Sequence, residues 1–493
     1  MAKRHLLSKS TFISGLQCKK KLYLSKKHRD LASPRTAAAE AIMKQGTSMG
    51  ELAQFVFPNG KDATPEYYWD YAPSIAQTKT WIEAGEPTIY EAAFQANGVM
   101  AALDILIHKN GERIALEVKS STSVKEYHLN DAALQYWVME QAGFKPDRFF
   151  IMHLNNQYVR EGKIKVRRLF HWEEVTEVVL ARQKDIADQV QELKGVLQAT
   201  EVPQVDIGAH CSEPFACEFA AHCWRHIPEN SIFEVSGLGK KAWNYYEQGI
   251  LAIKDLPEED TFSTLQQLQI AGVKNGQKVI EKKEIEDFLG DWQFPLYFFD
   301  FETINPALPP YDGCRPYEQL GVQYSLHVLK DDASLMHSEF LAQAGEDPRK
   351  EMVEKILQSL GSSGSIVAYN MGFEKRVIQS LANTFPEYQK QLEALLDRFV
   401  DLMIPFQKGW YYLPEMQGSY SIKAVLPALF PKDKTLDYSA LSIGNGSDAS
   451  VYLQAMLENR VQKEELTDLR KELLAYCKLD TLAMVKIWEV LKW

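Results

Sequence analysis

The alternation of apolar and polar positions predicts two strands near residue 100. Residues 99–107 and 114–119 are apolar runs, and the Asn-Gly pair at 110–111 between them is typical of a tight hairpin turn. A polar loop follows, and then a helix is expected with Gln135 near its start. A β-hairpin followed by a helix is therefore the first structural prediction.

A second strand-rich region is expected in the last two hundred residues. The aromatic run 297–299 follows Pro295 and predicts a buried strand, and residues 365–369 predict another strand that leads into a helix near Phe373. Residues 473–482 have helical periodicity. The pattern indicates an α/β fold here as well.

Between these regions the sequence becomes polar and helical. Residues 265–273 and 275–289 predict short helices, and the glycine-containing turn at 235–241 is either an ordinary spacer or a hairpin that offers backbone N–H groups to a phosphate. We therefore predict three parts: a first domain over 1–227, a helical linker over 228–292 and a last domain over 293–493.

Composition is that of an ordinary globular chain, with 45% hydrophobic and 25% charged residues in 493. No run of about eighteen apolar residues occurs, so no membrane span is predicted, and without a secretory signal we expect a cytoplasmic protein. The net charge of −11 excludes a uniformly basic surface for nucleic acid. A local basic patch is present, which is either a phosphate-tracking surface or a solvated helix face; it consists of Lys19, Lys20, Lys21, Lys26, Lys27, His28 and Arg29.

Four acids in the last region are candidate metal ligands. Asp300 and Glu302 alternate along one strand and so share a face, Glu374 follows the second strand, and Asp480 lies on the last helix. Tyr476 lies one helical turn before Asp480, on the same face. Two divalent cations about 3.5–4 Å apart need several hard oxygen ligands of this kind, an arrangement used for phosphodiester hydrolysis.

The hairpin carries its own charged residues. Asp104 stands in an apolar strand, and Glu117 and Lys119 share one face of the next strand. Two carboxylates with a nearby cation could form a metal site and hold a phosphate. The alternative is an ordinary hairpin with solvated charges on one face.

Cysteines provide a third candidate site. Six cysteines without a secretory signal make a disulfide framework unlikely, whereas a group of thiolates suits an iron–sulfur cluster or zinc. The candidate ligands are Cys18, Cys211, Cys217 and Cys223. If the metal were zinc, His210, His222 or His226 could replace a thiolate.

Residues 294–493 resemble the DnaQ-like 3′–5′ exonucleases of the DEDD group, tyrosine subtype, which have a ribonuclease H-like fold. The resemblance implies that Asp300, Glu302, Glu374 and Asp480 bind Mg²⁺ or Mn²⁺ and that Tyr476 orients the attacking water. The second motif normally ends in aspartate, so Glu374 departs from it by one methylene.

Residues 7–226 are similar to the RecB-type PD-(D/E)XK nucleases, with a restriction-endonuclease-like fold. They are most like the iron–sulfur branch, which includes the CRISPR-associated RecB-like exonucleases and AddB. The resemblance implies that Asp104 and Glu117 bind metal, that Lys119 is catalytic and that Gln135 belongs to an accessory motif. It also implies a [4Fe–4S] cluster on Cys18, Cys211, Cys217 and Cys223. The histidine of the first motif is absent, and Glu51 is a possible substitute.

The order of the two modules resembles a bacterial family that fuses an iron–sulfur RecB-like nuclease to a DnaQ-like exonuclease. This implies a metal-dependent nuclease whose partner is single-stranded or end-containing DNA, with RNA as an alternative. A further alternative is that the N-terminal half is a non-catalytic module that binds DNA for one exonuclease. The sequence does not identify a protein partner.

Overall fold

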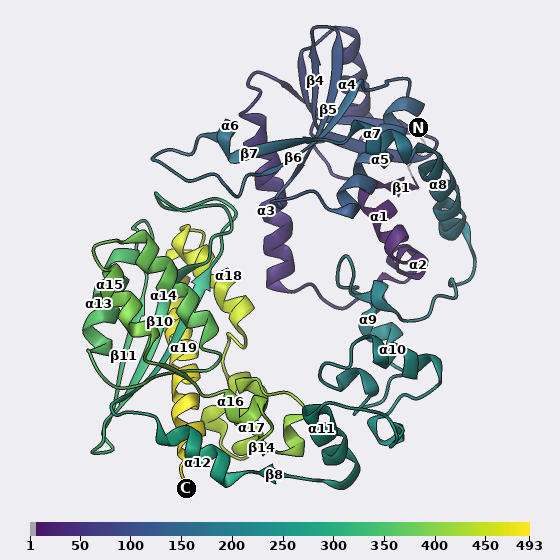
Figure 1. Ribbon diagram of the computed structural model, residues 1–493. Coiled ribbons are helices and arrows are strands. Elements are labelled where there is room, and N and C mark those ends of the chain that lie inside the picture. The colour runs from purple at the N-terminus through teal and green to yellow at the C-terminus, as the bar shows by residue number, and fades with distance from the viewer. Residues whose placement is uncertain (1–5) are drawn as a thin grey trace. The chain divides into compact units, whose positions relative to one another are not determined.

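The computed structural model describes residues 6–493, a mixed α/β structure with several sheets (Figure 1). It divides into two compact units. The first ends at His226 and also contains Ala307–Tyr317, and the second comprises Ile227–Pro306 and Glu318–Trp493. Residues 1–5 of the predicted first domain lie outside the described residues. The segment predicted as a separate linker, 228–292, belongs to the second unit.

A mixed sheet forms the centre of the first unit, in the order β2-β3-β4-β5-β6-β7, with β1 beside β4. Its strands are β1 (Leu7–Ser8), β2 (Lys61–Asp62), β3 (Thr88–Ala96), β4 (Val99–Lys109), β5 (Glu112–Lys119), β6 (Arg148–Leu154) and β7 (Phe170–Glu174). The predicted hairpin is confirmed: β4 and β5 are antiparallel, and Asn110 and Gly111 have φ of 54° and 83°, as a two-residue turn with left-handed residues requires.

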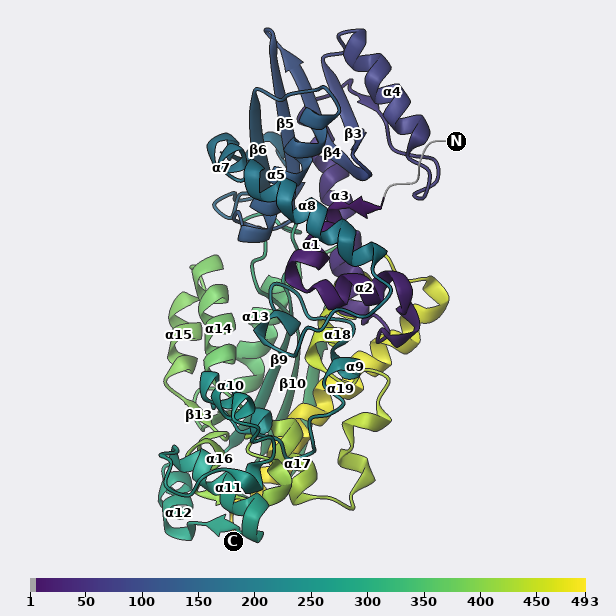
Figure 2. The same cartoon turned by 90° about the vertical axis from the view of Figure 1, so that its right-hand side faces the viewer.

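Helices cover both faces of this sheet (Figure 2). On one face Phe12, Leu134 and Val190 bury their side chains, and on the other Met49 and Ala53 pack with strand residues. The helices on the first face are α1 (Lys9–Gln17), α5 (Glu126–Gln141), α7 (Thr176–Ala181), which adds Val179, and α8 (Gln183–Gln198), and α3 (Ala37–Gln54) lies on the second. The remaining helices of the unit are α2 (Lys19–Lys27), α4 (Ala72–Glu83), α6 (Val166–Leu169) and α9 (Ala220–Cys223).

One sequence prediction about this unit is wrong. Gln135 lies in the second half of α5, not near its start, because the helix begins at Glu126, directly after the polar loop. The side chain of Gln135 is completely buried there.

The segment Ala307–Tyr317 belongs to the first unit although the strands on either side of it in the sequence belong to the second. The backbones of Gly313 and Cys314 exchange hydrogen bonds with Arg160, at 2.9 and 3.0 Å. The hydroxyl of Tyr317 donates to the carbonyl of Ser120 at 2.5 Å. Ser120 follows Lys119, so this segment contacts the chain directly after the candidate catalytic lysine.

A five-stranded sheet forms the centre of the second unit, in the order β11-β10-β9-β12-β13. Its strands are β9 (Leu296–Ile304), β10 (Leu320–Leu329), β11 (Leu335–Leu341), β12 (Ile366–Ala368) and β13 (Phe399–Asp401). The first three are antiparallel, whereas β12 runs parallel to β9 and β13. Parallel strands need a crossover, and α14 with α15 supplies the one between β12 and β13.

Helices of the second unit surround this sheet, and α19 contacts both β9 and β10 (Figure 1). They are α13 (Arg349–Leu360), α14 (Gly372–Thr384), α15 (Gln389–Leu396), α16 (Ile404–Gln407), α17 (Ile422–Leu429), α18 (Gly446–Leu457) and α19 (Lys463–Leu491). Residues 473–482, predicted to be helical, lie within α19.

The part before β9 contains α10 (Lys240–Glu247), α11 (Thr264–Asn275), β8 (Val279–Ile280) and α12 (Lys282–Gly290). The helix predicted over 275–289 is therefore wrong in its first half. Gly276 adopts φ of 66° and ends α11, and β8 pairs with β14 (Tyr411–Tyr412) before α12 begins. Strand pairing with a distant segment decides the conformation here.

No helix within residues 6–493 has the length and apolar character needed to cross a membrane.

Arg398 holds the loop that leads into β12. Its guanidinium donates to the carbonyl oxygens of Leu360, Gly361 and Gly364, each at 2.8 Å, and to that of Ser363 at 2.5 Å. Replacing it leaves these carbonyls without a charged donor, so we expect Arg398→Ala to lower the free energy of unfolding by about 2 kcal/mol, measured by urea denaturation. The matched control is Arg460→Ala, which removes a surface pair with Glu458 and should change it by less than about 0.5 kcal/mol. Equal losses would show that the loop does not depend on Arg398.

Candidate metal centres

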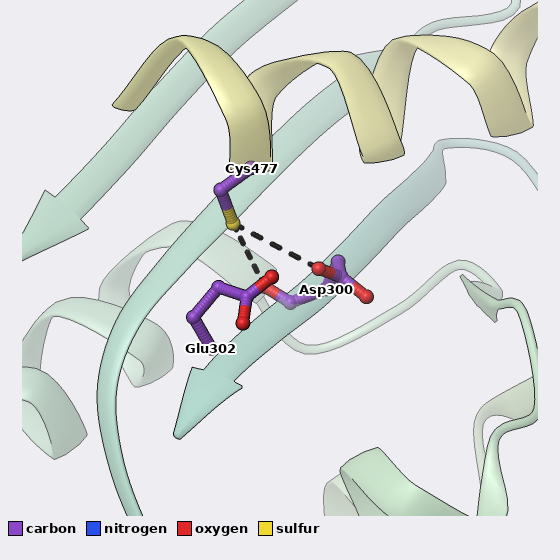
Figure 3. A group of neighbouring side chains, drawn as sticks. All are labelled: Asp300, Glu302 and Cys477. Atoms are coloured by element: carbon purple, nitrogen blue, oxygen red, sulfur yellow. Dashed lines mark hydrogen bonds between the residues drawn. The ribbon is translucent and has the colours of Figure 1, made fainter. Parts of the chain in front are cut away.

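Two acids on β9 and a thiol on α19 form the tightest group of possible ligands in the second unit. The side chains of Asp300 and Glu302 lie on one face of β9, as their alternation predicts, and Cys477 points toward them from α19 (Figure 3). One ligand atom from each lies within 4.8 Å of the other two. Across the described residues, no other three histidine, cysteine, aspartate or glutamate side chains meet this distance.

Glu374 and Asp480 complete a group of four acids. Glu374 lies in the first turn of α14, and Asp480 projects from α19; both are buried. The negative charges of Asp480, Glu302 and Glu374 each add to the raised pKa of Asp300, so these three carboxylates lie within electrostatic reach of Asp300. The structure therefore brings together the four acids that the sequence singled out.

Burial is the main cause of the unusual protonation of these acids. Burial first, and the neighbouring acids second, raise the pKa of Glu302 to about 8 and hold that of Asp300 well above its ordinary value. Burial also raises the pKa of Glu374 to about 8 and that of Asp480 to about 6. The Oε2 atom of Glu374 is buried without a hydrogen-bond partner in the described structure. The attraction of Lys423 lowers the pKa values of Glu302 and Asp480, but it does not outweigh burial.

Tyr476 and two further residues surround Asp480. The hydroxyl of Tyr438 donates to Asp480 at 2.6 Å, and the ammonium of Lys423 donates to the Tyr476 hydroxyl at 3.2 Å. Lys423 also lies over the rings of both tyrosines, 5.2 Å from each centroid. Burial, followed by the charge of Asp480, holds the pKa of Tyr476 well above its ordinary value, so its phenol stays protonated.

Asp401 has a structural position. Its carboxylate accepts backbone hydrogen bonds from Asn370 at 2.9 Å, Met371 at 3.1 Å and Met403 at 3.0 Å. It therefore fixes the turn between β12 and α14, where Asn370 has a φ of 70°. Asp401 supports the placement of Glu374 through these backbone contacts, and its charge also adds to the raised pKa of Glu374.

The first unit contains a second acid group, arranged across three strands. Asp104 lies on β4 beside Ile105, which is paired with Tyr90 on β3 and Leu116 on β5. By this register Asp104 is opposite Glu91 on β3 and Glu117 on β5. The Oδ2 atom of Asp104 accepts from the Val118 backbone at 2.5 Å. Glu91 has a φ of 50°, a strained conformation for a residue in a strand. Burial, assisted by the charge of Glu117 and opposed by that of Lys9, raises the pKa of Glu91 to about 7 and that of Asp104 well above its usual range.

Two lysines surround Glu117. Lys119 donates to its Oε1 at 2.8 Å, and Lys9, the first residue of α1, lies 2.9 and 3.1 Å from its two oxygens. Burial alone would raise the pKa of Glu117, but the attraction of these ammonium groups outweighs it and holds that pKa well below its ordinary value. Both oxygens of Glu117 are thus paired with Lys9.

Gln135 joins this group through Asp131. Lys119 donates to Asp131 at 2.6 Å, and the Gln135 amide lies 3.5 Å from the other oxygen of Asp131. The Oε1 of Gln135 is buried without a partner in the described structure. The structure thus brings Asp104, Glu117, Lys119 and Gln135 together, as predicted. Glu51, the possible first-motif substitute, is exposed on α3 instead.

The four predicted cysteines line one cavity of the first unit, together with Lys20, Lys21, His210 and Phe219. Cys18 ends α1 and begins α2, and the other three come from the chain before and within α9. No three of their sulfur atoms lie within 4.8 Å of one another in the described structure. Burial raises the pKa of Cys217 and Cys223.

Several residues of these sites were missed by sequence reasoning: Lys9, Glu91, Asp131, Lys423, Tyr438 and Cys477. Glu91 could have been found as an acid in an apolar strand. Cys477 and Asp131 lie on helices that already carried candidates, so helical spacing could have indicated them. Nothing local marks Lys9, Lys423 or Tyr438, because each reaches its site through a contact distant in sequence.

Comparisons with known proteins identify relatives without assigning a role. Residues 297–421, which include Asp300, Glu302 and Glu374, match a family described as a domain of unknown function (DUF2779). An uncharacterized protein of Mycoplasma pneumoniae, the MG366 homolog, is 28% identical over 206 residues, which are 38% of this chain and 31% of that protein. The uncharacterized protein UU173 of Ureaplasma parvum is 27% identical over 234 residues, which are 43% of this chain and 33% of that protein.

The aligned part therefore spans about a third of the length of these relatives. A solved structure titled "Crystal structure of SSO0001" aligns with 45% of this chain and 87% of its own, at 12% identity and a TM-score of 0.25. A TM-score of that size does not establish a common fold.

The raised pKa values predict how stability depends on pH. Without metal, the folded protein keeps protons on Asp480, Glu302 and Glu374 that the unfolded chain loses near pH 4–4.5, so stability should fall as pH rises from about 4 to about 8. Divalent metal should remove this loss by compensating the ionised acids. We expect Mg²⁺ to raise the melting temperature more at about pH 8.5 than at about pH 5.5, measured by calorimetry.

The matched comparison is the double variant Asp300→Asn/Glu302→Gln, which should respond less to Mg²⁺ at the higher pH. An equal response of the native protein at both pH values would contradict this explanation of the buried acids.

Proposed function

We propose that the chain is a divalent-metal-dependent nuclease, with a 3′–5′ exonuclease site formed by Asp300, Glu302, Glu374 and Asp480. The observation that carries this proposal is the convergence of four acids, with Glu302, Glu374 and Asp480 buried and Asp300 partly buried, whose like charges have no full internal compensation. A five-stranded mixed sheet with two of the acids on a central strand supports a ribonuclease H-like arrangement.

The donor set fits Mg²⁺ or Mn²⁺. These ions prefer carboxylate oxygens, and the unpartnered Oε2 of Glu374 is an available ligand atom. When bound, such ions stabilise the charge that develops on a phosphodiester and make water a better nucleophile. The extra methylene of Glu374 is compatible with this role, because its first-turn position on α14 leaves that oxygen buried near the other acids.

The protein's own residues would orient the reactants. Tyr438 fixes one oxygen of Asp480 through its hydroxyl, and Lys423 holds the phenol of Tyr476 by a hydrogen bond. Because Tyr476 stays protonated, its role would be to orient the attacking water by hydrogen bonding rather than to remove a proton.

A second nuclease site is proposed around Asp104 and Glu117, with Lys119 as the catalytic cation. Lys119 bridges Glu117 and Asp131, which fixes its ammonium beside the acids where it could steady a phosphate. Gln135 supports Asp131 from within α5. The strained φ of Glu91 next to Asp104 is also typical of functional sites.

One observation favours a different role for the first unit. Lys9 pairs with both oxygens of Glu117, so this carboxylate already has a counterion. That pairing suits a module that binds nucleic acid without cleaving it and passes the strand to one exonuclease. The proposed substrate is DNA that is single-stranded or has free ends, and RNA is the alternative. Comparing the cleavage rates on DNA and RNA oligonucleotides of the same sequence would distinguish the two.

The cysteine-lined cavity fits a [4Fe–4S] cluster better than zinc. A tetrahedral zinc ion with 2.3 Å bonds to sulfur places its thiolates about 3.8 Å apart. No three of these sulfurs lie within even 4.8 Å of one another in the described residues, and a cluster is larger than one ion. The [4Fe–4S] cluster would be held by Cys18, Cys211, Cys217 and Cys223. It would thereby link residue 18 to the segment 211–223.

Separate variants test the two nuclease sites. Asp300→Asn and Asp480→Asn should lower 3′-end trimming of labelled single-stranded DNA by at least roughly 100-fold, because each removes a charged metal ligand. In the Asp300→Asn background, adding Lys119→Ala should abolish any cleavage that remains.

The matched control is Asp468→Asn, an exposed acid on the same helix as Asp480, which should trim at the native rate. Native trimming by Asp300→Asn would exclude the exonuclease assignment. Residual cleavage that is unaffected by Lys119→Ala would favour a non-catalytic first unit.

The cofactor proposal has a spectroscopic test. Protein purified without oxygen should be brown, should absorb in the visible range and should contain about four irons per chain, the number in a [4Fe–4S] cluster. Cys211→Ala should lose this absorption, whereas Cys314→Ala, a buried cysteine outside the cavity, should keep it. A colourless protein with one zinc per chain would contradict the cluster.

A further inference from the structure

We propose that the acid site of the second unit also binds a thiophilic transition ion of the zinc class through Cys477, and that this ion inhibits it. The inhibition rests on the proposed nuclease function, whereas the binding does not.

The thiol of Cys477 is inside the acid group. It is completely buried, and its Sγ lies 3.8 Å from Oδ2 of Asp300 and 4.0 Å from the carbonyl oxygen of the same residue (Figure 3). Cys477 follows Tyr476 on α19, so the helix presents it beside the acids on β9. Glu302 supplies the third ligand atom within 4.8 Å.

These distances are close to those around a tetrahedral zinc ion. With zinc bonds of 2.3 Å to sulfur and 2.0–2.2 Å to oxygen, sulfur and oxygen lie about 3.5–3.7 Å apart. The Sγ to Oδ2 distance of 3.8 Å needs only a small adjustment. A thiolate with two carboxylates is a mixed ligand set that zinc and cobalt accept.

Glu374 provides a second, independent observation. Glu374 exposes only 2% of its surface to solvent. Its Oε2 atom has no hydrogen-bond partner in the described structure. Its charge contributes to the raised pKa of Asp300, so Glu374 lies near this group, although it is not among the residues whose ligand atoms lie within 4.8 Å of one another.

Hard and soft ions would use this group differently. Mg²⁺ prefers oxygen ligands in near-octahedral geometry and does not bind thiolates well. A thiophilic ion displaces the proton of the Cys477 thiol, which leaves to solvent, and forms a bond to the thiolate. Asp300 and Glu302 are then engaged by that ion and are no longer available to Mg²⁺.

Cobalt(II) is a suitable probe because a cobalt–thiolate bond produces a charge-transfer absorption that oxygen ligands do not. The full-length protein is titrated with Co²⁺ after the cavity lined by the four cysteines has been loaded with its proposed [4Fe–4S] cluster. We expect a thiolate-to-cobalt band in the native protein that is absent from Cys477→Ser and retained by Cys314→Ser, a matched buried cysteine. If Cys477→Ser fails to fold, as judged by its melting curve, Cys477→Ala serves in its place.

Inhibition is measured against each variant's own rate with Mg²⁺. Half-inhibition by Zn²⁺ should need roughly tenfold more zinc in Cys477→Ser than in the native protein, and Cys314→Ser should match the native protein. A cobalt spectrum unchanged by Cys477→Ser overturns the site, whatever the activity. A Cys477-dependent band in a protein without nuclease activity supports the site and contradicts the proposed function instead. If Cys477→Ser trims DNA and is inhibited by the same zinc concentration as the native protein, the proposed inhibition through Cys477 is wrong.

Discussion

The crowding of like charges in a buried place is the constraint on which both candidate sites depend. Carboxylates taken out of water repel one another strongly and lose hydration, and proteins tolerate this only with protons, cations or hydrogen-bond donors nearby. Around Asp300 the acids lack sufficient compensation, so their pKa values rise. The backbone supplies part of the support, as when Asp401 fixes the turn before Glu374.

The two units resolve the same problem in different ways. In the second unit, one lysine, Lys423, approaches the acids and is shared with two tyrosine rings. In the first unit, Lys9 and Lys119 are bound directly to Glu117, and Asp131 holds Lys119 from the other side. In the second unit the pKa values of all four acids are raised, whereas in the first unit the two lysines compensate Glu117 and the pKa values of Glu91 and Asp104 stay raised.

The parts of this structure that could be predicted from sequence are those with a local physical cause. The hairpin follows from Asn110 and Gly111, and the shared face of Asp300 and Glu302 follows from the period of a strand. The helix over 275–289 could not be assigned correctly, because β8 exists only by pairing with β14. Lys9 reaches Glu117 across more than a hundred residues, and no local pattern indicates such a contact. Long-range packing decided these positions, not intrinsic preference.

Helix α1 has one further consequence. Its first residue, Lys9, contacts Glu117, and the residue that ends it, Cys18, lines the cysteine cavity. At 1.5 Å per residue, nine helical residues make a rod of about 14 Å. At its far end Gln17 is tied to the carbonyl oxygens of His210 and Phe215, at 2.8 and 2.6 Å. Because both ends of α1 are held by these contacts, a displacement of the helix along its axis would disturb the acid group and the cysteine cavity together.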